Sequence, residues 1–97
     1  MKTKKEAEPL KVRPDSRFKK DVKRIGKGDR ADVAAAQAVI SRLAARETLD
    51  AEFRDHALAG KWKAYRECHV RPDLLLIYKI EKGELLLARL GSHAELF

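Results

Sequence analysis

The side chains best suited to proton transfer stand in the second half of the chain. His56 and His69 lie within the segment DHALAGKWKAYRECHVRPD, which ends with Asp73, and His93 comes near the C-terminus. An imidazole gains and loses a proton near neutral pH, so it is a frequent general acid or base. The aspartate follows a proline in an expected turn. There it either serves the turn itself or is a carboxylate near His69 that accepts a proton or orients an imidazole. All three histidines fall at the ends or edges of expected elements, where catalytic groups gather, although solvated histidines without a function are the alternative.

Cationic and aromatic side chains accompany these histidines. Phe97 follows a polar stretch without core-forming periodicity, so we expect its ring to stack on a nucleotide base. Trp62 and Tyr65 are instead expected to pack in the core or on the sheet. The residues expected to contact RNA, through charge or stacking, are Phe97, Arg89, Arg66, Arg71, Lys61 and Lys63.

A metal site would be another use for three imidazoles and Asp73. No two of the histidines have the HxH or HExxH spacing of a rigid ligand pair, and their surroundings are cationic. We therefore expect neither a metal nor another cofactor. Cys68 is the only cysteine, so it forms no internal disulfide. It is expected to be a small buried hydrophobe in a protein of a reducing cytoplasm.

The charge of the chain favours a polyanionic partner. Its 97 residues include 22 lysines and arginines against 15 acidic residues, for a net charge of +7. Residues 11–30 alone carry nine basic and three acidic side chains, which indicates either a solvated helix face or a surface that contacts phosphates. No apolar run approaches the roughly 20 residues of a membrane span, and the lysine-rich start lacks the apolar region of a signal peptide.

The elements that position these residues can be read from apolar periodicity and turn residues. We expect a short edge strand at 10–14, a helix from Asp15 or Ser16 to about Lys27, and a second helix over residues 30–46 capped by Asp29. An irregular segment, 48–61, precedes strands at about 62–69, 74–80 and 84–90. The last strand is expected to place Leu86, Ala88 and Leu90 on one face with Arg89 on the other.

This order, β-α-α-β-β-β, predicts an α+β fold in which a helical hairpin packs on a small, mostly antiparallel sheet. A flexible basic tail is expected over residues 1–9, and a single domain over residues 10–97.

The second half of the chain also resembles a known family. The segment contains the pattern DH-x-L-x-G-x-W-x-x-YR-x-x-H-x-x-PD, followed by an apolar strand ending in IY and by a terminal R-x-G-[ST]-H-x-x-LF. It closely resembles the YafQ branch of the RelE-like toxins of bacterial type II toxin–antitoxin systems over residues 55–97. The helical half, including FKKDVKR, is similar only in kind. Ala57 replaces a proline that is frequent in the family, and Leu74 replaces an aromatic residue.

The resemblance implies a RelE-like fold and an mRNA endonuclease that cuts in the ribosomal A site without a metal. It also implies silencing by a cognate acidic antitoxin of the RelB or DinJ kind, and contacts with ribosomal RNA. By position, the functional residues of the family fall on His56, His69, His93, Asp73 and Phe97. The two departures leave every proton-transfer group in place, so they bear on substrate preference more than on activity.

Metal-free RNA cleavage uses the 2′-hydroxyl as the nucleophile, so it requires a base, an acid and cations near the phosphorus. We favour His93 as the general acid and Asp73 as the general base, with His56 and His69 orienting or stabilising the phosphate. An exchange of these roles among the histidines stays open. One rival interpretation is a non-catalytic RNA- or ribosome-binding module, which would not need all four residues. Another is a DNA-binding antitoxin, but such proteins usually pair a ribbon or helix-turn-helix with a disordered tail, and the sequence shows neither.

Overall fold

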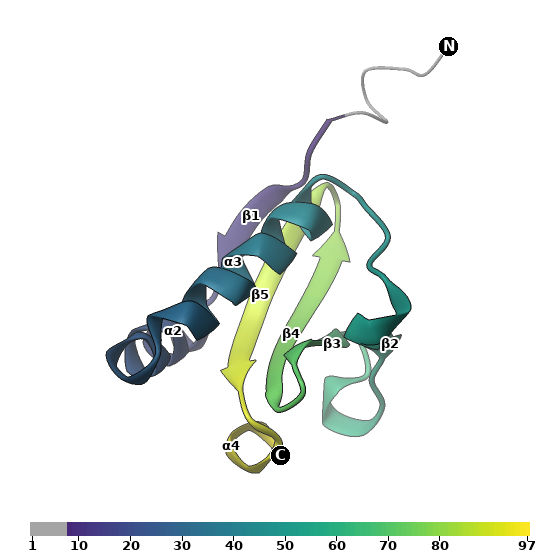
Figure 1. Cartoon of the computed structure of the whole chain (residues 1–97). Coiled ribbons are helices and arrows are strands. Elements are labelled where there is room, and N and C mark those ends of the chain that lie inside the picture. Colours follow the sequence, from purple (N-terminus) through teal and green to yellow (C-terminus); the bar gives the residue numbers. More distant parts are fainter. Residues whose placement is uncertain (1–7) are drawn as a thin grey trace.

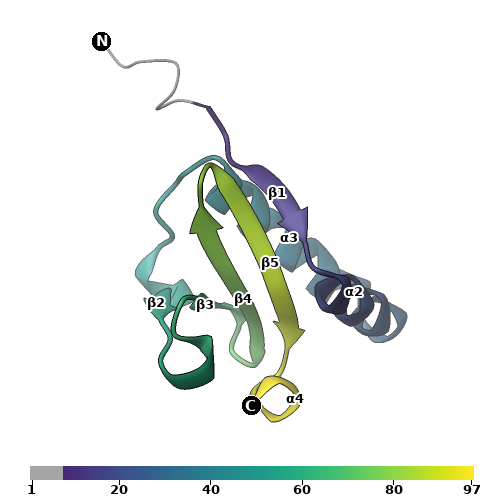
Figure 2. The ribbon, with the colours of Figure 1, turned by 180° about the vertical axis from the view of Figure 1, so that it is seen from behind.

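The computed structural model describes residues 8–97, so most of the tail expected over residues 1–9 lies outside the described part of the chain. Five strands form one sheet, with two longer helices on one of its faces and a short helix at the C-terminal end (Figures 1 and 2). The elements, in chain order, are β1 (Lys11–Pro14), α2 (Ser16–Gly28), α3 (Arg30–Ala44), the 3-10 turn η1 (Ala51–Phe53), β2 (His56–Ala57), the 3-10 turn η2 (Gly60–Trp62), β3 (Arg66–Arg71), β4 (Leu74–Glu81), β5 (Glu84–Gly91) and α4 (His93–Leu96).

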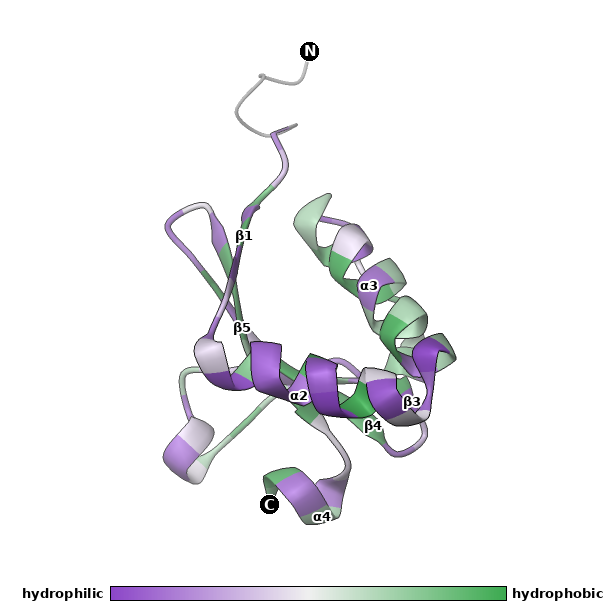
Figure 3. Ribbon diagram, turned by 90° about the vertical axis from the view of Figure 1, so that its left-hand side faces the viewer, coloured by the Kyte–Doolittle hydropathy of each residue, from purple (hydrophilic) through white to green (hydrophobic). Residues whose placement is uncertain are grey.

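The sheet order is β1-β5-β4-β3-β2, and only the β1–β5 pair is parallel. The helical hairpin on a mostly antiparallel sheet is therefore confirmed. Both long helices begin where the sequence predicts, because Asp15 accepts a hydrogen bond from the Arg17 amide and Asp29 accepts one from the Ala31 amide. Along its solvent side α2 is mainly hydrophilic (Figure 3).

Two apolar clusters cover the two faces of the sheet. The larger lies under α2 and α3 and includes Phe18, Val39 and Leu43. The smaller lies on the other face, where Leu75 and Ile77 pack with Leu96 of α4 and with residues of the β2–β3 connection. Residues 74–77 are buried in both directions, as a central strand requires.

Several local features differ from those predicted. The strand expected from residue 62 begins at Arg66, because Gly60–Trp62 forms a 3-10 turn that continues into a hydrogen bond from the Tyr65 amide to the Trp62 carbonyl. The second helix ends at Ala44 rather than at residue 46, since Arg46 adopts a left-handed conformation with φ 65°. The segment 48–61, expected to be irregular, contains β2, and the unpredicted helix α4 follows β5.

The last strand does not alternate as expected. The pairing passes from Ile77 opposite Arg89 to Tyr78 opposite Leu87, so Ala88 is an extra residue in β5. This bulge reverses the alternation. As a result, Leu90 joins the cluster under the helices while Ala88 faces the opposite cluster, and the prediction that they share a face is wrong.

No helix in the described part, residues 8–97, is both long and apolar enough to cross a membrane.

Candidate active site

The three histidines come from three different elements and form a row. His56 lies on β2, His69 on β3 and His93 at the start of α4. The ring centroids of His56 and His69 are 6.4 Å apart, those of His69 and His93 are 5.8 Å apart, and that of Phe97 lies 6.1 Å beyond His93. Residues distant in the sequence thus meet at one end of the sheet.

Asp73 contacts His93 and not, as the sequence suggested, His69. It lies in the turn between β3 and β4, where its Oδ1 accepts a hydrogen bond from the His93 amide at 3.1 Å. The same oxygen is 3.4 Å from His93 Nδ1. When that nitrogen carries the proton, Nε2 is the nitrogen left for exchange with a bound molecule.

Glu67 is a functional candidate that sequence reasoning missed. Its side chain is only 5% exposed, and its Oε2 lies 3.4 Å from His56 Nε2 and 3.5 Å from His69 Nε2. The sequence could have indicated Glu67, because residues at i and i+2 of a strand share a face, which places Glu67 beside His69. The contact with His56 depends on β2, whose pairing sets His56 directly opposite Glu67.

His56 has an oxygen acceptor on each side. Its Nδ1 is 2.6 Å from the carbonyl oxygen of Arg54, while its Nε2 faces Glu67. A carbonyl and a carboxylate can only accept hydrogen bonds, so whichever ring nitrogen carries a proton has an acceptor in front of it.

Asp55 fixes the loop that leads into His56. Its Oδ1 accepts a hydrogen bond from the Tyr78 hydroxyl at 2.6 Å and one from Arg66 Nε at 3.2 Å. Burial and this carboxylate raise the pKa of the Tyr78 hydroxyl, which therefore stays protonated and donates. Neighbouring Cys68 is fully buried, and burial raises the pKa of its thiol to about 12, which confirms it as a core residue.

The three arginines expected to bind RNA are all engaged with carboxylates. Arg66 contacts Asp55, and Arg71 Nε lies 2.7 Å from Asp32 of α3. The third, Arg89, places Nε 2.8 Å and Nη2 3.1 Å from the two carboxylate oxygens of a buried aspartate, Asp21.

Asp21 holds the end of β5 against α2. Burial alone would raise the pKa of its carboxyl. Hydrogen bonds from Arg89, from the Leu90 amide and from Arg24 outweigh burial and hold that pKa below its usual range. The carboxylate of Asp21 is therefore ionised, and its ion pair with Arg89 joins α2 to β5.

Helix α4 sets the position of His93 and Phe97. Ser92 and Glu95 form a capping box, Glu95 Oε1 lies 3.5 Å from Arg24 Nη2, and Leu96 is buried. Phe97 remains 60% exposed, as a residue that stacks on a base would be.

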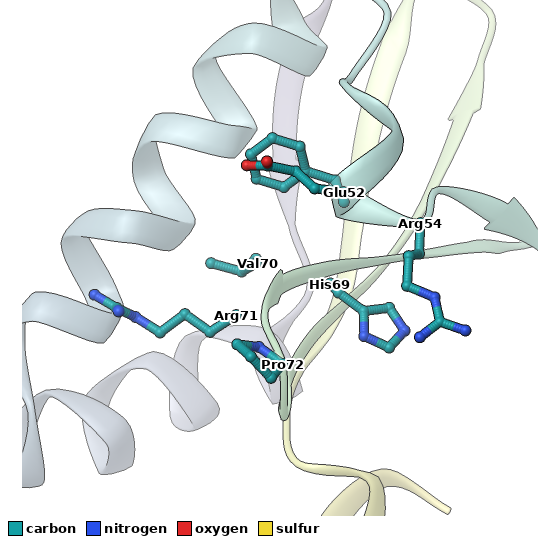
Figure 4. A pocket seen from close by; sticks show the side chains of 7 residues that line it. Glu52, Arg54, His69, Val70, Arg71 and Pro72 are labelled. Atoms are coloured by element: carbon teal, nitrogen blue, oxygen red, sulfur yellow. The ribbon is translucent and has the colours of Figure 1, made fainter.

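Two open cavities flank the row of histidines. One of about 390 Å³ lies against β3 and is lined by residues 52–54 and 69–72, including His69 (Figure 4). The other, of about 300 Å³, is lined by residues that include Lys61, Trp62 and Phe97. Lys63 is exposed just beyond it in the sequence.

Within residues 8–97, no group of three or more histidine, cysteine, aspartate or glutamate side chains is placed to hold a metal ion. The arrangement can supply proton donors and acceptors from the imidazoles, carboxylates to orient them, and an exposed ring for stacking.

Comparisons with known proteins agree with this description. A family model described as the bacterial toxin YafQ of type II toxin–antitoxin systems matches residues 10–97. The mRNA interferase toxin YafQ of Escherichia coli (strain K12) is 51% identical over 49 residues, which are 50% of this chain and 53% of that protein. The chain thus spans about half the length of this relative in the alignment.

Solved structures extend the likeness to nearly the whole chain. A copper-bound mutant toxin from Helicobacter pylori is 47% identical, with 91% of this chain and 99% of that chain covered and a TM-score of 0.81. The toxin in the E. coli DinJ–YafQ complex is 35% identical, with 91% and 98% covered and a TM-score of 0.80.

Proposed function

The chain belongs to the YafQ family of bacterial type II toxin–antitoxin toxins, and we propose that it is an endoribonuclease that cuts mRNA on the ribosome without a metal ion. The observation that carries the proposal is the row of three imidazoles and their carboxylates. Asp73 lies beside His93, and Glu67 lies between His56 and His69. A relative of this family is named an mRNA interferase. Such an enzyme would act in the cytoplasm, where its substrate is translated.

The proposed reaction is attack of a 2′-oxygen on the adjacent phosphorus. The bond from phosphorus to the 5′-oxygen breaks, so the products are a 2′,3′-cyclic phosphate and a free 5′-hydroxyl. One group must remove the proton of the 2′-hydroxyl while another protonates the leaving 5′-oxygen. With ring centroids 5.8 Å apart, His69 and His93 can both reach one phosphodiester through hydrogen bonds of about 2.8 Å.

We assign the general acid to His93, which Asp73 orients through Nδ1 so that Nε2 faces the substrate. We assign the general base to His69. Glu67 beside its Nε2 favours a proton on that nitrogen and leaves Nδ1 to accept one. This moves the base from Asp73, favoured from the sequence, to a histidine, an exchange that the sequence left open. His56, whose two ring nitrogens face the Arg54 carbonyl and Glu67, is proposed to orient these groups beside the phosphate.

Dependence on the ribosome is supported by the openness of the site. The side chain of His93 is 57% exposed and that of Phe97 protrudes beside it. In-line attack needs a splayed RNA backbone, and positioning of this kind supplies a large share of the rate of such reactions. We propose that the ribosome presents the mRNA in that geometry, and that the exposed lysines and arginines of α2 bind ribosomal RNA.

The proposed partner is an acidic antitoxin encoded beside the toxin. Support comes from the DinJ–YafQ complex of a relative and from the net charge of +7, which favours an acidic inhibitor. Its C-terminal segment would fold upon the toxin and prevent RNA from reaching the histidines.

The proposal is tested with purified protein and an mRNA that is either free or bound to programmed ribosomes. We expect cleavage only on ribosomes, unchanged by EDTA, with 2′,3′-cyclic phosphate ends. Binding to ribosomes without cleavage would favour the non-catalytic module, and EDTA-sensitive cutting of free RNA would refute both the ribosome and the metal-free parts.

A further inference from the structure

Arg54 differs from the other arginines around the histidines. Arg66, Arg71 and Arg89 each place guanidinium nitrogens on a carboxylate. The side chain of Arg54 is exposed, and among residues 8–97 no carboxylate oxygen lies within the 4.0 Å of an ion pair with it. Its charge is therefore available to a bound anion.

Arg54 is also joined to the site through its backbone. Its carbonyl oxygen accepts a hydrogen bond from His56 Nδ1 at 2.6 Å. Its side chain lines the same cavity as His69, and the two side chains point the same way from the chain in Figure 4. One residue thus contacts the first histidine of the row and reaches toward the second.

The backbone of Arg54 is held in an unfavourable conformation. It caps η1 with φ 49° and ψ 45°, in the left-handed region where a side chain is disfavoured and glycine is preferred. Such residues persist where the surroundings hold them and are frequent at functional sites. An arginine at a position suited to glycine points to a use for its guanidinium.

We propose that Arg54 binds the non-bridging oxygens of the phosphodiester in the cavity beside His69 and stabilises the charge that grows on them during attack. The inference rests on the proposed function for its substrate, an RNA phosphodiester. A guanidinium presents paired donors that match two phosphate oxygens, which an imidazole cannot do. With the other three arginines engaged, Arg54 supplies the guanidinium that the reaction needs.

The test measures cleavage of mRNA on programmed ribosomes by three variants, Arg54→Gln, Arg54→Lys and Arg54→Gly. The matched control is Lys82→Gln, because Lys82 is also an exposed cation with positive φ, 52°, but lies in the β4–β5 turn at the other end of the sheet (Figure 1). For Arg54→Gln we expect kcat to fall about 100- to 1,000-fold with a smaller change in KM, as for loss of one donor to a developing oxyanion. Arg54→Lys should recover part of kcat, and the control should stay within about twofold of wild type.

The glycine variant separates function from folding. Arg54→Gly suits the left-handed backbone, so its melting temperature should not fall although kcat does. A wild-type kcat in Arg54→Gly or Arg54→Gln would overturn the proposal, and so would a change confined to KM, which would make Arg54 a general RNA-binding cation.

A second measurement does not depend on cleavage. Titration with inorganic phosphate, followed by NMR, should shift the Arg54 Nε–H and His69 ring signals of the wild type, and the His69 shift should weaken in Arg54→Gln. If the wild type itself does not cut mRNA, the proposed function fails while this titration still decides the Arg54 site. The Arg54 site would be refuted if the Arg54 and His69 signals did not shift with phosphate, or if the His69 shift were the same in wild type and Arg54→Gln.

Discussion

Replacing Gly91 with alanine should loosen α4 and remove most of the activity while the sheet stays folded. An alanine Cβ at this position would lie 2.8 Å from Glu95 Oε1 and 3.2 Å from Leu96 Cδ2. The carboxylate can rotate away, but the Ser92 amide then loses its acceptor at 2.8 Å and Arg24 loses one of its two carboxylate partners, with Asp21 remaining. Leu96 must also shift within the cluster on which α4 rests.

The size of the effect follows from these contacts. Loss of a helix cap costs about 1 kcal/mol, and a partial exposure of Leu96 costs some fraction of the about 1.5–3 kcal/mol that burial of a leucine contributes. We expect the free energy of unfolding to fall by about 1–3 kcal/mol, with a melting temperature lower by about 4–8 °C for each kcal/mol. The row of histidines is more sensitive, because a displacement of about 1 Å of a catalytic group can cost about 100-fold in rate.

The assay combines thermal unfolding, cleavage on programmed ribosomes and the amide NMR signals of α4. Gly26→Ala is the matched control, since its nearest neighbour, Val33 Cγ2, lies at an ordinary 3.5 Å and an alanine within α2 should be neutral or stabilising. If Gly91→Ala keeps wild-type cleavage and an unchanged His93 amide signal, α4 does not position that histidine as argued.

Three further predictions concern the acidic residues and the metal. Glu67→Gln should lower single-turnover cleavage by about 100- to 10,000-fold, because His56 and His69 lose the carboxylate that orients them; unchanged cleavage would show that the contact is incidental. Asp21→Asn should lower the free energy of unfolding by about 3–5 kcal/mol at neutral pH, since Arg89 is left without its partner. The pKa of Asp21 is lower in the folded than in the unfolded chain, so its contribution to stability is present above about pH 4 and is lost as the pH falls through the folded pKa. Urea unfolding should therefore show that the difference in unfolding free energy between wild type and variant shrinks in acid. A difference that stays constant with pH would contradict this. EDTA should leave the cleavage rate unchanged, and a loss restored by one added divalent ion would point to a metal-dependent reaction.

The long elements follow from local signals that the sequence carries. Asp15 and Asp29 cap the two helices, and the buried run at residues 74–77 is the central strand that its composition predicts. The ends of β3 and α3 were misplaced because a 3-10 turn and a left-handed residue interrupt an otherwise favourable pattern.

The site was only half predictable for a different reason. The types of its histidines and of Asp73 pointed to proton transfer, but their contacts are set by tertiary pairing. A strand of two residues, β2, has no periodicity to detect, yet it places His56 opposite Glu67. The bulge at Ala88 could not be predicted from the sequence either, because only the register between β4 and β5 shows which residue is extra.

The net charge of +7 therefore overstates the cationic character next to the histidines. Arg66, Arg71 and Arg89 are committed to carboxylates that connect the strands and helices, so most of the nearby guanidinium charge stabilises the fold. The other exposed cations beside the site are lysines such as Lys61 and Lys63. With few phosphate contacts, the site should bind free RNA weakly and gain most from a scaffold that brings the substrate to it. These ion pairs within the fold therefore support the proposal that cleavage depends on the ribosome, and they leave the free guanidinium of Arg54 with a large share of the proposed phosphate contact.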